Sequence, residues 1–199
     1  MPDFVKIVRE NLPSMTDRSD LELLRLFQNG DESAFNHLVL RYQEKVYWVA
    51  RRFISDHDGA DDVTQEVFCK AYESLKEFRG ESSIYTWLYR ITVNIALNAI
   101  RKQKVREFFR IDEMFDVQDT TSISPDEAIE KSEERDLIER AVATLPEKQK
   151  SVFVLRYYEE LPYEEIAKIL KTSVGGLKAN YFHAVRKIQE YVKRAHGTR

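Results

Sequence analysis

The sequence of 199 residues predicts an all-α protein of two small helical domains joined by an acidic linker, the second domain ending in a helix-turn-helix. Apolar residues recur at the three- and four-residue spacing of amphipathic helices along most of the chain. Residues 107–123 interrupt this pattern, because they are acidic and have no sustained period, which is typical of a linker. We therefore expect a mobile tail over residues 1–18 and domains over residues 19–106 and 124–195.

The first domain is predicted to begin with a short helix and a long one. Ser19 or Asp20 can cap the short helix, and the Asn29-Gly30 pair would end it. Its expected inward residues are Leu21, Leu24 and Phe27. Asp31 is the expected start of the long helix, in which apolar residues keep to one face without a miss. These residues are Phe35, Leu38, Val39, Tyr42, Val46, Val49, Ala50 and Phe53.

Residues 61–102 are predicted to form two further helices joined by a loop. The expected buried residues of the first are Val63, Val67, Phe68, Ala71, Leu75 and Phe78. This spacing leaves an acidic, amide-bearing patch facing outward. The patch consists of Asp61, Asp62, Gln65 and Glu66. Gly80 is the expected end of this helix, and Ser82 or Ser83 can cap the next.

The second of these helices has two contrasting faces. Its apolar face is formed by Ile84, Leu88, Ile91, Ile95 and Ala99. A separate strip contains Trp87, Arg90, Asn94, Asn98 and Arg101. Aromatic, amide and guanidinium groups stack on bases, read base edges and hold phosphates. The strip therefore indicates either a nucleic-acid contact or a solvated helix face with one exposed Trp.

The second domain starts at Ser124, which can cap a helix with Pro125 in its first turn and Glu127 returning the capping bond. The expected apolar face of this helix is Ile138, Ala141, Val142 and Leu145, followed by Pro146 as the stop. A helix over residues 147–159 would bury Val152, Phe153 and either Leu155 or Tyr157.

Residues 161–192 have the spacing of a helix-turn-helix, with the turn at Lys171-Thr172-Ser173. The first helix would pack through Ile166, Ala167 and Leu170, and the second through Val174, Leu177, Tyr181, Ala184, Val185 and Ile188. The expected outward residues are Gly175, Gly176, Lys178, Ala179, Phe182, His183, Arg186 and Lys187. Two glycines at a helix start cost up to about 1 kcal/mol each, which suggests close backbone approach to a phosphate. A merely exposed basic helix is the alternative.

Charge is distributed in blocks, although the formal net charge is only −3. Residues 90–110 hold six basic residues against one acidic, and residues 166–194 hold seven against one. Between them, residues 111–139 hold eleven acidic residues against two basic. Two basic patches flanking an acidic divider indicate two separate DNA contacts.

Other chemistries find little support in the sequence. The single cysteine, Cys69, excludes an internal disulfide, and the four histidines lack the spacing of a zinc site. Asp61, Asp62 and Glu66 could hold magnesium, but no second acidic motif complements them, so a protein-docking face is favoured. No nucleotide-binding or hydrolase motif occurs, and we expect no cofactor, no metal and no enzymatic activity. The longest apolar run, residues 46–50, predicts no membrane insertion and a cytoplasmic protein.

The motifs DVTQEVF at residues 62–68 and FRGESSIYTWLYRITVNIALNAIRK at residues 78–102 resemble region 2 of bacterial sigma factors of the extracytoplasmic-function group. The resemblance implies that the first helix clamps the coiled coil of core RNA polymerase, through Asp62, Gln65 and Glu66. It also implies that the second helix and its preceding loop take the −10 promoter element. By position, the residues concerned are Trp87, Arg90, Asn94, Asn98 and Arg101.

Residues 126–195 resemble region 4 of the same family, which binds the −35 element through its helix-turn-helix. The residues implied are Gly175, Lys178, Ala179, Phe182, His183 and Arg186. Pro162 stands where the family usually has Ser or Thr, and Gly175-Gly176 where it has Gly-Thr. Ala179, Asn180 and His183 stand where it often has Ser and Arg. These departures do not change the expected fold. They do mean that the bases read by the family cannot be carried over to this chain.

The resemblance implies an alternative sigma factor with core RNA polymerase, promoter DNA and an anti-sigma factor as partners. It would also route the linker through the RNA-exit region of the polymerase. A stand-alone helix-turn-helix regulator that acts without polymerase is the other hypothesis. That hypothesis leaves the acidic helix and the second basic helix unexplained.

Overall fold

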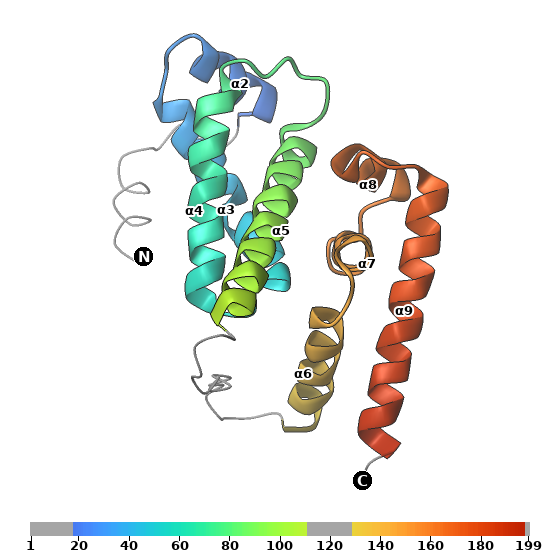
Figure 1. The fold of residues 1–199 in the computed structure, drawn as a ribbon. Helices are drawn as coiled ribbons and strands as arrows, with labels where there is room; N and C mark the ends of the chain where they lie inside the picture. Colours follow the sequence, from blue (N-terminus) through green and yellow to red (C-terminus); the bar gives the residue numbers. More distant parts are fainter. Residues whose placement is uncertain (1–17, 111–128, 198–199) are drawn as a thin grey trace. The chain divides into compact units, whose positions relative to one another are not determined.

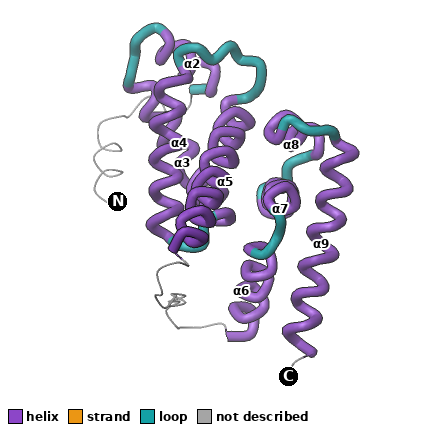
Figure 2. The backbone as a smooth tube through the Cα atoms, viewed as in Figure 1, coloured by secondary structure: helices purple, strands orange, loops and turns teal. Residues whose placement is uncertain are grey.

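Helices form both parts of the chain that the structure, a computed structural model, describes: residues 18–110 and 129–197 (Figure 1). Within these ranges no strand occurs, as the colouring by secondary structure shows (Figure 2). The chain divides into two compact units, Met1–Ala96 and Leu97–Arg199. The all-α prediction with two helical domains is confirmed. The predicted linker from residue 111 onward and the capping sequence at Ser124 lie outside the described residues.

The first unit contains α2 (Asp20–Gln28), α3 (Ser33–Phe53), α4 (His57–Leu75) and the first part of α5 (Ile84–Arg110). α3 packs against both α2 and α4. The long apolar face predicted for α3 is buried apart from Val39, which is half-buried. The core of the unit includes Leu23, Phe27, Val46, Val49, Val67, Leu75, Tyr89 and Val93.

α2 begins as predicted but turns a different face inward. The Ser19 hydroxyl accepts from the Glu22 amide, and the Glu22 carboxylate accepts from the Ser19 amide at 2.7 Å, which completes a capping box. Leu21, expected to be buried, is 57% exposed. Leu23 is buried in its place, because the buried arc runs through Leu23, Leu24 and Phe27, and Leu21 lies outside it.

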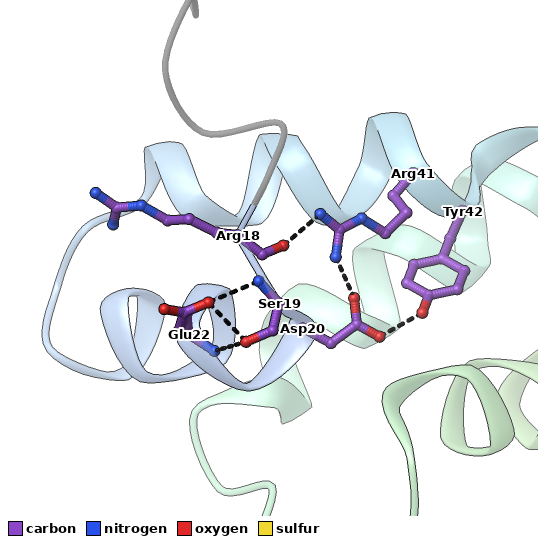
Figure 3. Close-up of polar contacts among 6 residues, drawn as sticks. All are labelled: Arg18, Ser19, Asp20, Glu22, Arg41 and Tyr42. Carbon is purple, nitrogen blue, oxygen red and sulfur yellow. Dashed lines mark hydrogen bonds and ion pairs between the residues drawn. The ribbon is translucent and has the colours of Figure 1, made fainter.

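Polar contacts fasten the start of α2 to α3 (Figure 3). One carboxylate oxygen of Asp20 accepts from Arg41 at 2.5 Å, and the other accepts from the Tyr42 hydroxyl. Arg41 also donates to the carbonyl of Arg18 at 2.6 Å, so the last residue of the predicted tail is held in place. Burial, and then the bond to Asp20, raise the pKa of the Tyr42 phenol.

The limits of α4 and α5 differ from those predicted. α4 starts at His57, because the Asp56 carboxylate caps it by accepting from the Gly59 amide at 2.6 Å. It ends at Leu75, and Gly80 takes its left-handed conformation (φ +72°) in the loop beyond. Ser83 caps α5 by accepting from the Thr86 amide at 3.0 Å. α5 runs to Arg110, so the first four residues of the predicted linker are helical.

The second unit contains α6 (Ile129–Ala143), α7 (Glu147–Phe153), the π-helical turn η1 (Val154–Tyr158), α8 (Tyr163–Leu170) and α9 (Val174–Gly197). α9 packs against α6, α7 and α8. One cluster of buried residues in this core consists of Ala141, Val142, Leu145, Phe153, Ala184 and Ile188.

Three details decide the packing of the second unit. Leu155 is buried and Tyr157 is 53% exposed, which settles the alternative that the sequence left open. In α8, Ile169 is buried, whereas the predicted Ala167 and Leu170 are half-buried. Lys171 then turns the chain with a left-handed φ of 49°.

No helix in the described ranges combines the length and hydropathy that crossing a bilayer would require.

Candidate nucleic-acid and polymerase interface

The outward face of α4 is polar, as predicted. Asp62, Gln65 and Glu66 are exposed, while Val63 and Val67 on the opposite side are buried. An exposed face rich in carboxylates repels DNA phosphates and suits a basic protein surface. The exposed face of α4 is therefore better suited to a basic protein surface than to DNA.

Only some residues of the strip predicted on α5 are exposed. Asn94 and Asn98 are exposed and Arg90 is half-buried. Trp87 is only 6% exposed, so the expectation that its indole lies in an exposed strip is wrong. Helical spacing does align Trp87 with Asn94, but the loop before α5 covers this end of the strip, with Phe78 packed on the indole at 5.1 Å between ring centroids.

Arg101 lies in the second unit, Leu97–Arg199. Its side chain is exposed, but its guanidinium forms an ion pair with Glu147. Its guanidinium donates to the Glu147 carboxylate at 2.7 and 3.1 Å and to the Asn98 amide oxygen at 3.3 Å. These bonds to Arg101 lower the pKa of Glu147. A phosphate would have to compete with Glu147 for Arg101.

The outward face of α9 is as predicted except at Gly176, which is half-buried. Its exposed side chains are Lys178, Ala179, Phe182, His183, Arg186 and Lys187. Phe182 is 63% exposed, which is unusual for a large aromatic side chain on a soluble helix. A cationic helix face with an apolar centre can hold phosphates and also touch thymine methyl groups. Arg186 additionally pairs with Glu190 at 3.1 Å.

The two glycines at the start of α9 have different surroundings. A Cβ on Gly176 would lie 3.2 Å from the hydroxyl oxygen of Ser173, which caps the helix by accepting from the Gly176 amide. A Cβ on Gly175 would meet nothing within 4 Å among the described residues. Packing within the chain thus accounts for Gly176 but not for Gly175.

Two residues that the sequence pattern missed, Arg156 and Tyr163, lie beside the predicted Lys178 at the helix-turn-helix. The guanidinium of Arg156 lies 5.3 Å, and the ammonium of Lys178 5.8 Å, from the centre of the Tyr163 ring. Arg156 also donates to the Leu161 carbonyl at 2.9 Å, which fixes it beside α8. These residues come from three different helical elements, so periodicity along one helix could not group them.

The described ranges contain no group of three His, Cys, Asp or Glu side chains placed to hold a metal ion. The same ranges present an acidic face on α4, an amide-bearing strip on α5 and a cationic face on α9.

Comparison with known proteins assigns both units. Residues 38–106 match the Sigma-70 region 2 family, and residues 135–188 match the Sigma-70, region 4 family. The chain is 36% identical over 182 residues to the RNA polymerase sigma-H factor of Pseudomonas aeruginosa, covering 85% of this chain and 92% of that protein. It is 38% identical over 182 residues to the ECF RNA polymerase sigma-E factor of Escherichia coli K12, covering 88% and 95%.

A solved structure supports the same assignment. The sigma factor RpoE of Bartonella quintana, crystallised with the anti-sigma factor NepR, matches with a TM-score of 0.64 and 25% identity over 80% of this chain and 96% of that one. The resemblance inferred from the motifs is confirmed. The chain belongs to the sigma-70 family, within the extracytoplasmic-function group of RNA polymerase sigma factors.

Proposed function

We propose that this alternative sigma factor binds core RNA polymerase through α4, takes the −10 element with α5 and its preceding loop, and takes the −35 element with α9. The observation that carries the proposal is the exposed face of α9, where Lys178, Phe182 and Arg186 project from a helix whose other side is core. A recognition helix in the major groove needs one face exposed to the DNA and the opposite face packed in the protein core. Within α9, Gly175, Ala179 and His183 complete the surface assigned to the −35 element.

Polymerase binding is assigned to Asp62, Gln65 and Glu66. All three are exposed on α4, and their chemistry suits a basic coiled coil. We expect charge reversal at Asp62 and Glu66 (Asp62→Lys, Glu66→Lys) to abolish co-purification with core polymerase. Glu44→Lys is the matched control, because Glu44 is also exposed but lies on α3.

Promoter opening is assigned to the amides of α5. Asn94 and Asn98 can hydrogen-bond base edges, with Arg90 and Arg101 nearby for phosphates. Extruding a base costs a few kcal/mol, and stacking on an aromatic returns about 1–3 kcal/mol. Trp87 could supply that stacking only after the loop over it moves, so contacts with the polymerase must contribute the remainder. This mechanism needs no nucleotide hydrolysis and no catalytic residue in the chain.

An anti-sigma factor is the proposed regulator. The Bartonella relative was solved with NepR, and a second structure of the same fold, CnrH, with the cytosolic domain of CnrY. A factor of this kind would act in the cytoplasm, where its polymerase and DNA are. By the family resemblance, the acidic linker of residues 107–123 would pass through the RNA-exit region of the polymerase.

Reconstitution with bacterial core polymerase tests the proposal. We expect new transcript 5′ ends that share upstream −10 and −35 sequences when the protein is added to genomic template from its host. Start sites identical to those of core enzyme alone would contradict it. Specific operator binding without polymerase, and no co-purification with polymerase, would support a stand-alone regulator instead.

A further inference from the structure

Gln28, the last residue of α2, makes an unusual set of contacts with a distant segment. Its side-chain nitrogen lies 2.9 Å from the carbonyl oxygen of Phe78, 3.3 Å from that of Leu75 and 3.4 Å from that of Lys76. Carbonyl oxygens only accept hydrogen bonds, so the amide nitrogen of Gln28, with its two hydrogens, is the atom that suits this place. A carboxylate or a thioether of the same length could not donate there.

These carbonyls belong to the end of α4 and the loop that follows it. The last carbonyls of a helix have no partner within the helix, and here a side chain from 47 to 50 residues earlier in the chain supplies one. In the same loop, the ring of Phe78 packs on Trp87 in the first turn of α5. The Gln28 amide therefore acts on the loop, residues 76–83, that leads into α5.

α2 is itself held firmly, which makes it a suitable anchor. Its first residue, Asp20, is bonded to Arg41 and Tyr42 on α3 (Figure 3). Next to Gln28, the Phe27 ring lies 5.5 Å from Phe35 and 5.3 Å from Tyr72, measured between centroids. α2 thus contacts both α3 and the loop before α5. The match to region 2 begins at residue 38, so it does not include α2.

We propose that Gln28 is a positioning residue for −10 recognition, holding the loop 76–83 in the conformation from which the loop and α5 take the −10 strand. This inference rests on the proposed function of α5. Gln28 need not contact DNA itself. Without its amide, the loop would have to lose conformational entropy when DNA binds, and that cost would weaken binding to the correct strand.

The test compares Gln28→Met and Gln28→Glu with wild type in holoenzyme made from full-length protein. Met keeps the length but has no donor, and Glu places a carboxylate against the carbonyls. The probe is a single-stranded oligonucleotide with the −10 sequence of a promoter mapped from transcript 5′ ends, and a scrambled oligonucleotide is the reference. Gln189→Met, at an exposed position of α9, is the matched control.

We expect Gln28→Met to weaken binding of the −10 strand by about three- to tenfold, the effect of losing one ordinary hydrogen bond. Discrimination against the scrambled strand should fall, Gln28→Glu should be worse, and affinity for core polymerase should not change. Gln189→Met should behave as wild type. Unchanged discrimination in Gln28→Met would overturn the inference.

Hydrogen exchange on the free full-length protein separates positioning from a general loss of stability. We expect faster exchange in Gln28→Met at residues 76–83 and unchanged protection in α3. Equal loss of protection throughout α3, α4 and α5 would overturn the inference, since Gln28 would then be merely structural. If wild-type holoenzyme itself selects no −10 strand, the proposed function fails and this inference with it. If wild type selects the strand and Gln28→Met does so equally, only the inference fails.

Discussion

The indole of Trp87 packs against the ring of Phe78, with ring centroids 5.1 Å apart and ring planes inclined at 47°. Phe78 comes from the loop before α5, so the contact joins that loop to the first turn of the helix. The contact also helps to bury Trp87, which is 6% exposed. In the chain as described, Asn94, Asn98 and Arg101 are the exposed residues of the predicted −10 strip, and Arg101 is paired with Glu147.

The two tryptophans should therefore differ in their contribution to stability. Trp87→Ala should lower the free energy of unfolding by about 3–5 kcal/mol, because it removes a buried aromatic ring. Trp48→Ala should change it by only about 0.5 kcal/mol, since Trp48 is 47% exposed. Urea unfolding followed by circular dichroism measures both. A Trp87→Ala protein as stable as wild type would contradict the burial of the indole.

Replacing Asn94 and Asn98 with Ala should impair promoter opening without affecting polymerase binding. Each amide that reads a base edge contributes about 1–3 kcal/mol of discrimination, whereas neither side chain is part of the core. Permanganate reactivity of promoter thymines measures opening, and co-purification measures polymerase binding. Asn36→Ala, at an exposed position of α3, is the control. Normal initiation by the double variant would mean that the strip is only a solvated face.

Gly175→Ala should stabilise the free protein and weaken −35 binding. The new Cβ meets nothing within 4 Å in the described chain and gains up to about 1 kcal/mol in helix propensity. It would, however, stand between the backbone and an approaching phosphate. Gly176→Ala should gain less stability, because its Cβ would crowd the capping hydroxyl of Ser173. Thermal unfolding and holoenzyme binding to −35 duplex measure both effects, and unchanged duplex affinity in Gly175→Ala would contradict this use of the glycine.

Stability of the first unit should fall as the solution becomes acidic, partly because of His37. Its side chain is buried, and its Nε2 atom has no hydrogen-bond partner within the described residues. Burial, and then the charge of Arg41, lower the pKa of His37, with Arg18 acting in the same direction and Asp31 opposing. The neutral form is favoured in the folded state, so stability is retained above the ordinary pKa of about 6.5. It is lost as pH falls below that value and through the lower folded pKa.

Unfolding free energies of wild type and His37→Leu, measured between pH 8 and pH 5, test whether His37 lowers stability as the pH falls. The decline from pH 7 to pH 5 should be steeper in wild type, since the variant has no group to protonate at this position. Equal slopes would show that other groups account for the acid sensitivity.

The protein alone should bind promoter DNA weakly and with a steep dependence on salt. Each exposed cationic face is small, and each phosphate neutralised contributes about −0.9 to the slope of log K against log salt concentration. Lys178→Ala should reduce the magnitude of that slope by about 1. Fluorescence anisotropy over a salt series measures it. Tight promoter binding by the purified protein at physiological salt would favour the stand-alone regulator.

Much of the helical organisation could be predicted from local pattern. The buried faces of α3 and α9, the Ser19 cap and the exposed acidic face of α4 all follow from spacing within one helix. The exposure of Phe182 could be predicted as well, because its neighbours at helical spacing form an outward face. Family membership was recognisable from motifs within residues 62–102.

Other features were decided only by the tertiary structure. Periodicity identifies the face on which a residue lies, but it does not show which distant segment covers that face. For this reason helical spacing aligns Trp87 with Asn94 and Asn98 but does not predict its burial, which Phe78 from the preceding loop contributes. The bonds from Gln28 to the Phe78 carbonyl, and the grouping of Arg156 with Tyr163, likewise depend on segments brought together by folding. The sequence by itself determined the helices and the family, and packing between helices determined which side chains remain available to DNA, because burial depends on neighbours in space.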